Sequence, residues 1–145
     1  MDWKDNIITT NAGMKKVLDD TKTIAVLGIK PETRAGQAAH YVPSYMKSTG
    51  HKIIPVPTYY PEVTEILDEK VYRKLEDVPE SIDMVNVFRR SEDIPAHLED
   101  ILKSKPKSVW IQLGIRNDTV AEELAKAGIK VIQDACLMVE HRSLM

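Results

Sequence analysis

The chain has 145 residues and a formal net charge of −2. Apolar residues make up 43% and charged residues 29%, which excludes disordered, collagen-like and coiled-coil classes. This length corresponds to one domain, so we expect a single domain over residues 1–145. Within it we expect a leading helix at 11–21, a core at 22–136 and a C-terminal tail at 137–145.

The charge and the cysteine content limit the partners and the compartment. A mildly acidic chain does not attract nucleic acid or an anionic membrane through its overall charge, so we expect neither as a partner. The single cysteine, Cys136, cannot form an internal disulfide, which favours a reducing compartment and a cytoplasmic location. No apolar run approaches the ~20 residues that span a membrane, and the N-terminus lacks the apolar region of a signal peptide.

Apolar runs alternate with helical patterns along the chain. Val- and Ile-rich runs of this kind are typical of parallel strands that are buried on both faces. They predict strands at 23–29, 52–56, 83–88, 108–113 and 129–133. The stretch around 70–72 predicts at most a short sixth strand.

The segments between these runs have helical spacing. A helix opens at Ala35 and Gly36, and Pro43 should kink or break it. Ser91 can cap the next helix, Thr119 can start a capping box with Glu122, and a short helix follows at 137–141. Strands that alternate with helices predict an α/β fold, a three-layer, Rossmann-like, doubly wound parallel sheet of about five strands. Ligands of such sheets bind at the carboxyl ends of the strands.

The loop after the first strand reads GIKPETRAG over 28–36. Gly28 permits a close approach of strand and ligand, and Lys30 and Arg34 place positive charge beside a helix N-terminus, which favours a phosphate or pyrophosphate. An ordinary turn with solvated cations explains the same residues equally well. The loop matches neither the G-x-G-x-x-G pattern nor a P-loop.

The loop after the second strand lacks the acidic residue of an NAD site, because Val56 and Pro57 stand in its place. These two residues, with Tyr59, could pack against an adenine, although a rigid turn would also need them. In the third loop, Arg89 and Arg90 suit a second phosphate or a stacked adenine. They could equally pair with the acidic residues that follow.

The sequence contains no recognisable catalytic or metal-binding pattern. The four histidines have no metal-ligand spacing, and no nucleophile stands in a known motif. A lone cysteine such as Cys136 is usually a small buried apolar residue, and Gln112 could bond either into the site or to a neighbouring strand. We therefore expect neither catalytic residues nor a metal.

In this order, the strand-end motifs resemble the CoA-binding protein family. Its Rossmann-like domain is similar to the CoA-binding domain of the succinyl-CoA synthetase alpha subunit. The matching stretches are IAVLGIKP from 24, GHKIIPVP from 50, DMVNVFRRSEDIP from 83, WIQLG from 110 and AGIKVIQDAC from 127. The chain departs from the family at Lys30, where the family often has Ser, and at PVPT from 55, where it has Pro-Val-Asn-Pro.

The resemblance implies that coenzyme A or an acyl-CoA lies across the strand ends. Three groups of residues match the family's contacts. The phosphates would be lined by Gly28, Ile29, Lys30, Pro31 and Thr33, with Arg34 nearby. Val56 and Pro57 would border the adenine, and Val87, Phe88 and Arg89 would contact the pantetheine or the adenine.

The resemblance also bears on catalysis. The synthetases use a phosphorylated histidine in a second domain, for which this chain has no room. We therefore expect non-catalytic binding, as a carrier, sensor or regulatory subunit, with a homo-oligomer or a partner enzyme subunit as open options. The alternatives are a small NADP- or CoA-dependent enzyme that works with a partner subunit, and an assembly subunit without a small ligand.

Overall fold

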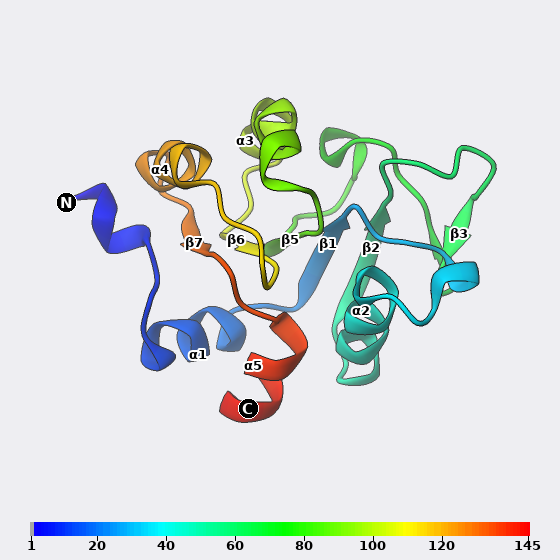
Figure 1. The fold of residues 1–145 in the computed structure, drawn as a ribbon, viewed down its shortest axis with the longest axis horizontal. Helices are drawn as coiled ribbons and strands as arrows, with labels where there is room; N and C mark the ends of the chain where they lie inside the picture. The colour runs from blue at the N-terminus through cyan, green and yellow to red at the C-terminus, as the bar shows by residue number, and fades with distance from the viewer. Residues whose placement is uncertain (1) are drawn as a thin grey trace.

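A parallel sheet of five strands runs through the centre of the computed structural model, which describes residues 2–145 (Figure 1). The strands stand in the order β2-β1-β5-β6-β7. They are β1 (Thr23–Leu27), β2 (Lys52–Val56), β5 (Met84–Val87), β6 (Ser108–Ile111) and β7 (Lys130–Ile132). The predicted parallel strands are confirmed, each as long as its apolar run or shorter. The stretch around 70–72 contributes instead to a separate antiparallel hairpin of β3 (Glu65–Ile66) and β4 (Glu69–Lys70).

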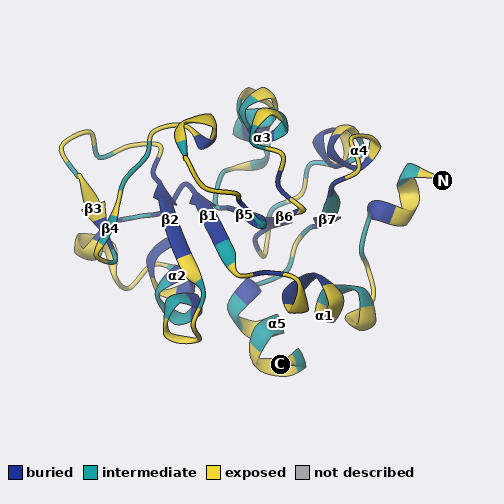
Figure 2. Cartoon of the chain, turned by 180° about the vertical axis from the view of Figure 1, so that it is seen from behind, coloured by how far each residue is buried: buried dark blue, intermediate teal, exposed yellow. Residues whose placement is uncertain are grey.

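Helices cover both faces of the sheet, so the predicted three-layer architecture is confirmed. On one face lie α3 (Leu98–Ser104) and α4 (Asp118–Lys126). On the other lie α1 (Asn11–Asp19), α2 (Ala38–Ser48) and α5 (Leu137–Leu144). Alternate strand residues point to opposite faces, so Val85 packs under α3 and α4 while Met84 packs under α1, α2 and α5. Figure 2 shows the buried strands between helices whose outer faces are exposed.

Several helix ends differ from the sequence expectation. The segment from Ser91 to His97 is the 3-10 helix η4, because Pro95 lacks the N–H that an α-helix needs. The hydroxyl of Ser91 donates to the carbonyl of Arg116 and does not cap this helix. Helix α4 is capped by Asn117, whose side chain accepts from the N–H of Val120, and not by Thr119. The other 3-10 helices are η1 (Trp3–Asn6), η2 (Glu32–Arg34) and η3 (Leu75–Asp77).

Of the kink or break expected at Pro43, the break does not occur, because helix α2 continues through this residue. Pro43 cannot donate to the carbonyl of Ala39 four residues earlier, which leaves that carbonyl free. The backbone N–H of Lys30 donates to it at 3.1 Å. The proline therefore frees an acceptor that ties the loop after β1 to α2. None of the helices in residues 2–145 is long and apolar enough to cross a bilayer.

Candidate functional site

A pocket of about 590 Å³ opens at the carboxyl ends of the strands. It lies beside the topological switch point between β1 and β5, because the chain crosses from β2 on one side of β1 to β5 on the other. Doubly wound sheets bind their ligands at such a point. The lining comes from the ends of β1, β5 and β6 and from the start of α2. The lining residues are Lys30, Gln37, Ala38, Ala39, Phe88, Arg89, Arg90, Ser91, Glu92, Gly114 and Ile115.

Gly28 sets how closely β1 and β5 approach at this pocket. Its φ is +91°, and a Cβ at this position would stand 2.3 Å from the carbonyl oxygen of Phe88. Its N–H donates to the carbonyl of Val56 at 2.9 Å, and the N–H of Phe88 donates to the carbonyl of Leu27 at 2.9 Å. The expectation at Gly28 is a close approach of strand and ligand; the structure shows instead a close approach of two strand ends.

The N-terminus of α2 faces the pocket without a cap. The side chain of Gln37, the N-cap residue, bonds none of the helix N–H groups and instead accepts from the ammonium of Lys30. The N–H groups of Ala38 and Ala39 have no backbone acceptor within residues 2–145. Two free N–H groups at the positive end of a helix, beside a lysine ammonium, form an anion site.

The loop between Lys30 and α2 is held by the carboxylate of Glu32. Its Oε2 lies 2.9 Å from Nε2 of His40 and also accepts the N–H of Leu67 at 2.9 Å. Partial burial by itself would raise the pKa of Glu32, but the bonds from His40 and Leu67 outweigh it, so the pKa falls below its usual value. Glu32 thus joins this loop to α2 and to the β3–β4 hairpin.

The side chains of Arg89 and Arg90 both pair with the carboxylate of Asp93. Arg90 Nε lies 2.9 Å from Asp93 Oδ2, and Arg89 Nη2 lies 3.6 Å from the same oxygen. This is the pairing with following acids that the sequence left open. Arg89 also donates from Nη1 to Thr58 Oγ1 at 3.2 Å, which connects the loop after β2 to the pocket.

Arg89 Nε donates to Nε2 of His97 at 3.3 Å. This contact needs a neutral His97 with its proton on Nδ1, because a protonated imidazole has no free lone pair. Burial is the main reason why the pKa of His97 lies below its usual value, and the charge of Arg89 lowers it further. His97 therefore helps to orient Arg89 as long as it stays neutral.

The residues predicted for the site occupy three kinds of position. Lys30, Phe88 and Arg89 line the pocket. Gly28, Ile29, Pro31, Val56, Pro57 and Val87 are buried and do not line it. Thr33 and Arg34 are exposed on η2, outside the lining. The structure thus gathers one part of the predicted set around the cavity and places another part in the protein interior.

Two of the remaining polar residues have structural partners. Gln112 accepts the N–H of Leu137 at 3.4 Å, so it bonds to the start of α5 rather than into the pocket. Trp110 is fully buried, and its Nε1 donates to the carbonyl of Ala135 at 2.9 Å. Cys136 is a half-buried free thiol outside the pocket lining. In the part of the chain that the structure describes, no three potential metal ligands are grouped to hold an ion.

The pocket suits a phosphorylated ligand with an apolar part. Lys30, the free N–H groups of α2 and the two arginines offer donors and positive charge for phosphates. Ala38, Phe88 and Ile115 offer apolar surface beside them. An elongated ligand could therefore place its phosphates at the start of α2 and its apolar part over the ends of β5 and β6.

Known proteins resemble the chain over nearly its whole length. A Bacillus subtilis protein, YneT, is 36% identical over 132 residues, which cover 91% of this chain and 94% of YneT. A solved structure from Thermus thermophilus has a TM-score of 0.86 at 36% identity and covers 94% of this chain and 100% of that one.

A larger protein shares only the fold. This is the dinucleotide-forming acetyl-coenzyme A synthetase 1 of Ca. Korarchaeum cryptofilum, with a TM-score of 0.66 and 21% identity over 80% of this chain and 26% of the synthetase. The family model described as "CoA binding domain" matches residues 22–142. With the strand order and the strand-end pocket already described, this match shows that the chain belongs to the CoA binding domain family.

Proposed function

We propose that the protein binds coenzyme A or an acyl-CoA in the strand-end pocket and acts without catalysis, as a carrier, sensor or regulatory subunit. The observation that carries this proposal is the uncapped N-terminus of α2 with Lys30 beside it. Each hydrogen bond to a charged phosphate contributes about 1.5–3 kcal/mol, so Lys30 and the two free N–H groups together favour a pyrophosphate at this position. Membership of the family supports coenzyme A as the source of that pyrophosphate.

The chemistry of the lining supports a role without catalysis. Among the residues that the structure describes, neither a histidine nor a cysteine lines the pocket. Its one side-chain hydroxyl, that of Ser91, donates to the carbonyl of Arg116, and no general base contacts it. A binder needs none of these groups, whereas acyl transfer would need a nucleophile with an adjacent base.

Calorimetric titration of the purified protein with coenzyme A, dephospho-coenzyme A, NAD and ATP tests the proposal. We expect saturable binding of coenzyme A and weaker binding of NAD, since no acid stands at Val56 or Pro57 to hold the ribose. Absence of binding at millimolar coenzyme A would refute the proposal.

A lysine variant locates the phosphates. Lys30→Met should weaken coenzyme A and dephospho-coenzyme A by the same factor, about tenfold or more, because Lys30 lies at the pyrophosphate position. The matched control is Lys16→Met, which removes an exposed lysine of α1 and should leave binding unchanged. A selective loss of coenzyme A would instead place Lys30 on the 3′-phosphate.

A further inference from the structure

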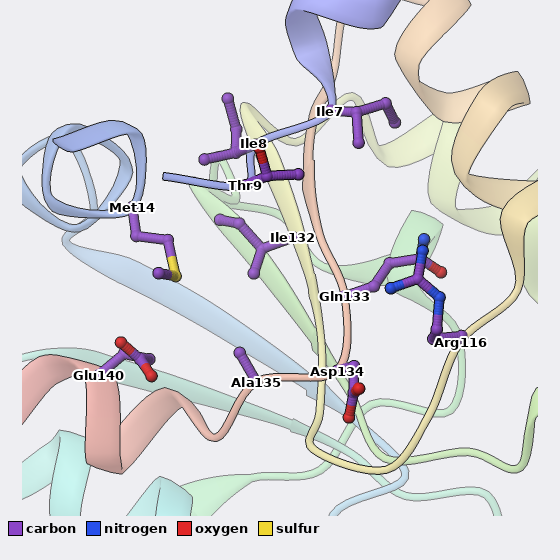
Figure 3. Close-up of a pocket in the computed structure, with 10 residues that line it drawn as sticks. All are labelled: Ile7, Ile8, Thr9, Met14, Arg116, Ile132, Gln133, Asp134, Ala135 and Glu140. Carbon is purple, nitrogen blue, oxygen red and sulfur yellow. The ribbon is translucent and has the colours of Figure 1, made fainter. Parts of the chain in front are cut away.

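A second cavity, of about 320 Å³, lies at the carboxyl end of β7 and shares no lining residue with the strand-end pocket. Its lining combines the N-terminal segment, the residues after β7, the loop before α4 and the first turn of α5 (Figure 3). The lining residues are Ile7, Ile8, Thr9, Met14, Arg116, Ile132, Gln133, Asp134, Ala135 and Glu140. This volume is at the lower end of the range for ligand sites and suits a small molecule.

The walls of this cavity are fixed by hydrogen bonds between distant segments. The N–H of Ile8 donates to the carbonyl of Val131 at 2.9 Å, which holds the N-terminal segment beside β7. The carboxylate of Asp134 accepts the N–H of Gly114 at 2.7 Å. Gln133 accepts the N–H of Asn117 at 2.7 Å. The cavity is thus built by contacts that lie far apart in the sequence.

Apolar side chains form the middle of the cavity. Ile132 is only 2% exposed, and Ile8, Met14 and Ala135 pack against the same core cluster. In Figure 3, Ile132 and Ala135 lie between Glu140 on one side and Arg116 with Asp134 on the other. A ligand that spans the cavity therefore meets charged groups at both ends and aliphatic carbon between them.

One end of the cavity holds charges of both signs, Arg116 and Asp134, and the other end holds the carboxylate of Glu140. Arg116 Nη2 donates to Asp118 Oδ1 at 2.9 Å, an oxygen that also accepts from Gln133 at 3.0 Å, and this anchors the guanidinium. Its Nη1 and Nε donate to no side chain or carbonyl within residues 2–145. Neither Asp134 nor Glu140 forms an ion pair within the same residues. Arg116 therefore keeps free donors for a carboxylate beside its pair with Asp118, and Asp134 and Glu140 offer carboxylates to ammonium groups.

We propose that this cavity binds a basic α-amino acid with an aliphatic chain of lysine type. The α-carboxylate pairs with Arg116, and the α-ammonium pairs with the adjacent Asp134. The methylene chain lies on Ile132 and Ala135, and the terminal ammonium reaches Glu140. The match is one of cavity size and of the order of charged and apolar groups, and it does not depend on coenzyme A.

The test is a titration of the full chain with L-lysine, followed by calorimetry and by amide chemical shifts in NMR spectra. We expect one saturable site, with shifts at Ile132 to Ala135. Norleucine lacks the terminal ammonium and 1,5-diaminopentane lacks the carboxylate, so each should bind about tenfold weaker or worse, the value of one charge-assisted bond.

Glu140→Gln should weaken lysine about tenfold while leaving norleucine unchanged. Glu123→Gln, at an exposed position of α4 outside the cavity, is the matched control and should change neither. Three results would overturn the proposal: no saturable binding of lysine at millimolar concentrations, equal binding of 1,5-diaminopentane, or equal losses in the two variants. Circular dichroism checks that both variants are folded.

Discussion

Replacement of Gly28 by alanine tests how the pocket is built. The new Cβ would meet the carbonyl oxygen of Phe88 at 2.3 Å, and the residue would have to keep a φ of +91°. The backbone conformation alone costs about 1–2 kcal/mol for a residue with a Cβ. Since the obstacle is a backbone carbonyl, no side chain can move aside, and forced overpacking adds about 1–3 kcal/mol.

We therefore expect Gly28→Ala to lower the free energy of unfolding by about 2–5 kcal/mol, a large share of the about 5–15 kcal/mol of a typical domain. The matched control is Gly50→Ala, where φ is +97° and no atom lies within 4 Å of the added Cβ. That variant should lose only the backbone part. Urea unfolding, followed by the fluorescence of the buried Trp110, measures both. Equal losses in the two variants would refute the close approach of β1 and β5.

Three further changes test two contacts around the pocket and one at the start of η3. Glu32→Gln should remove a pH-dependent contribution to stability. Because the pKa of Glu32 is lowered in the fold, this contribution is present above about pH 4.3 and is lost as the pH falls through the folded-state pKa. Melting curves across that range should fall less steeply for the variant, and parallel curves would contradict the role of Glu32. His97→Gln should remove a loss of stability that begins as the pH falls below about 6.5, because the fold favours the neutral imidazole. Melting temperatures at about pH 7.5 and about pH 5.5 should therefore differ less than in the unmodified protein, and an unchanged difference would exclude His97 as its source. Asp100→Ala should cost about 1–2 kcal/mol in urea unfolding, because its carboxylate accepts the N–H groups of Leu75 and Glu76 at 2.8 and 3.0 Å. The exposed Asp77→Ala is the control, and equal effects would argue against this cap.

The fold could be predicted because burial on both faces leaves a strong pattern in the sequence. Runs such as those of β1 and β5 contain almost only apolar residues, and the turns between them are polar. The helix starts were harder, because several residues near each end have cap-forming side chains. Thr119 and Asn117 are both good N-cap residues, and only the three-dimensional structure shows that Asn117 caps Val120.

The sequence could predict the parts of the site that depend on charged side chains, but not the parts that depend on backbone groups. Lys30 and Arg89 were identifiable because cations directly after buried strands must lie at the ligand edge of a parallel sheet. A helix N-terminus beside Lys30 was expected, but at Ala35 and Gly36, whereas α2 begins at Ala38. Ala38, Ala39 and Gly114 were therefore missed as individual residues. The two alanines offer backbone N–H groups, which leave no signal in residue type. The contacts of Arg89 with Thr58 and His97 join segments that are distant along the chain, so local patterns could not predict them.

The central claim is that the start of α2 holds the phosphates of coenzyme A. The most direct measurement is a series of ¹⁵N–¹H spectra during titration with coenzyme A. The account predicts that the amides of Ala38 and Ala39 show the largest shifts, with smaller shifts at Lys30, Phe88 and Gly114. Unchanged spectra, or shifts confined to the amino ends of the strands near Lys52 and Lys107, would contradict this account.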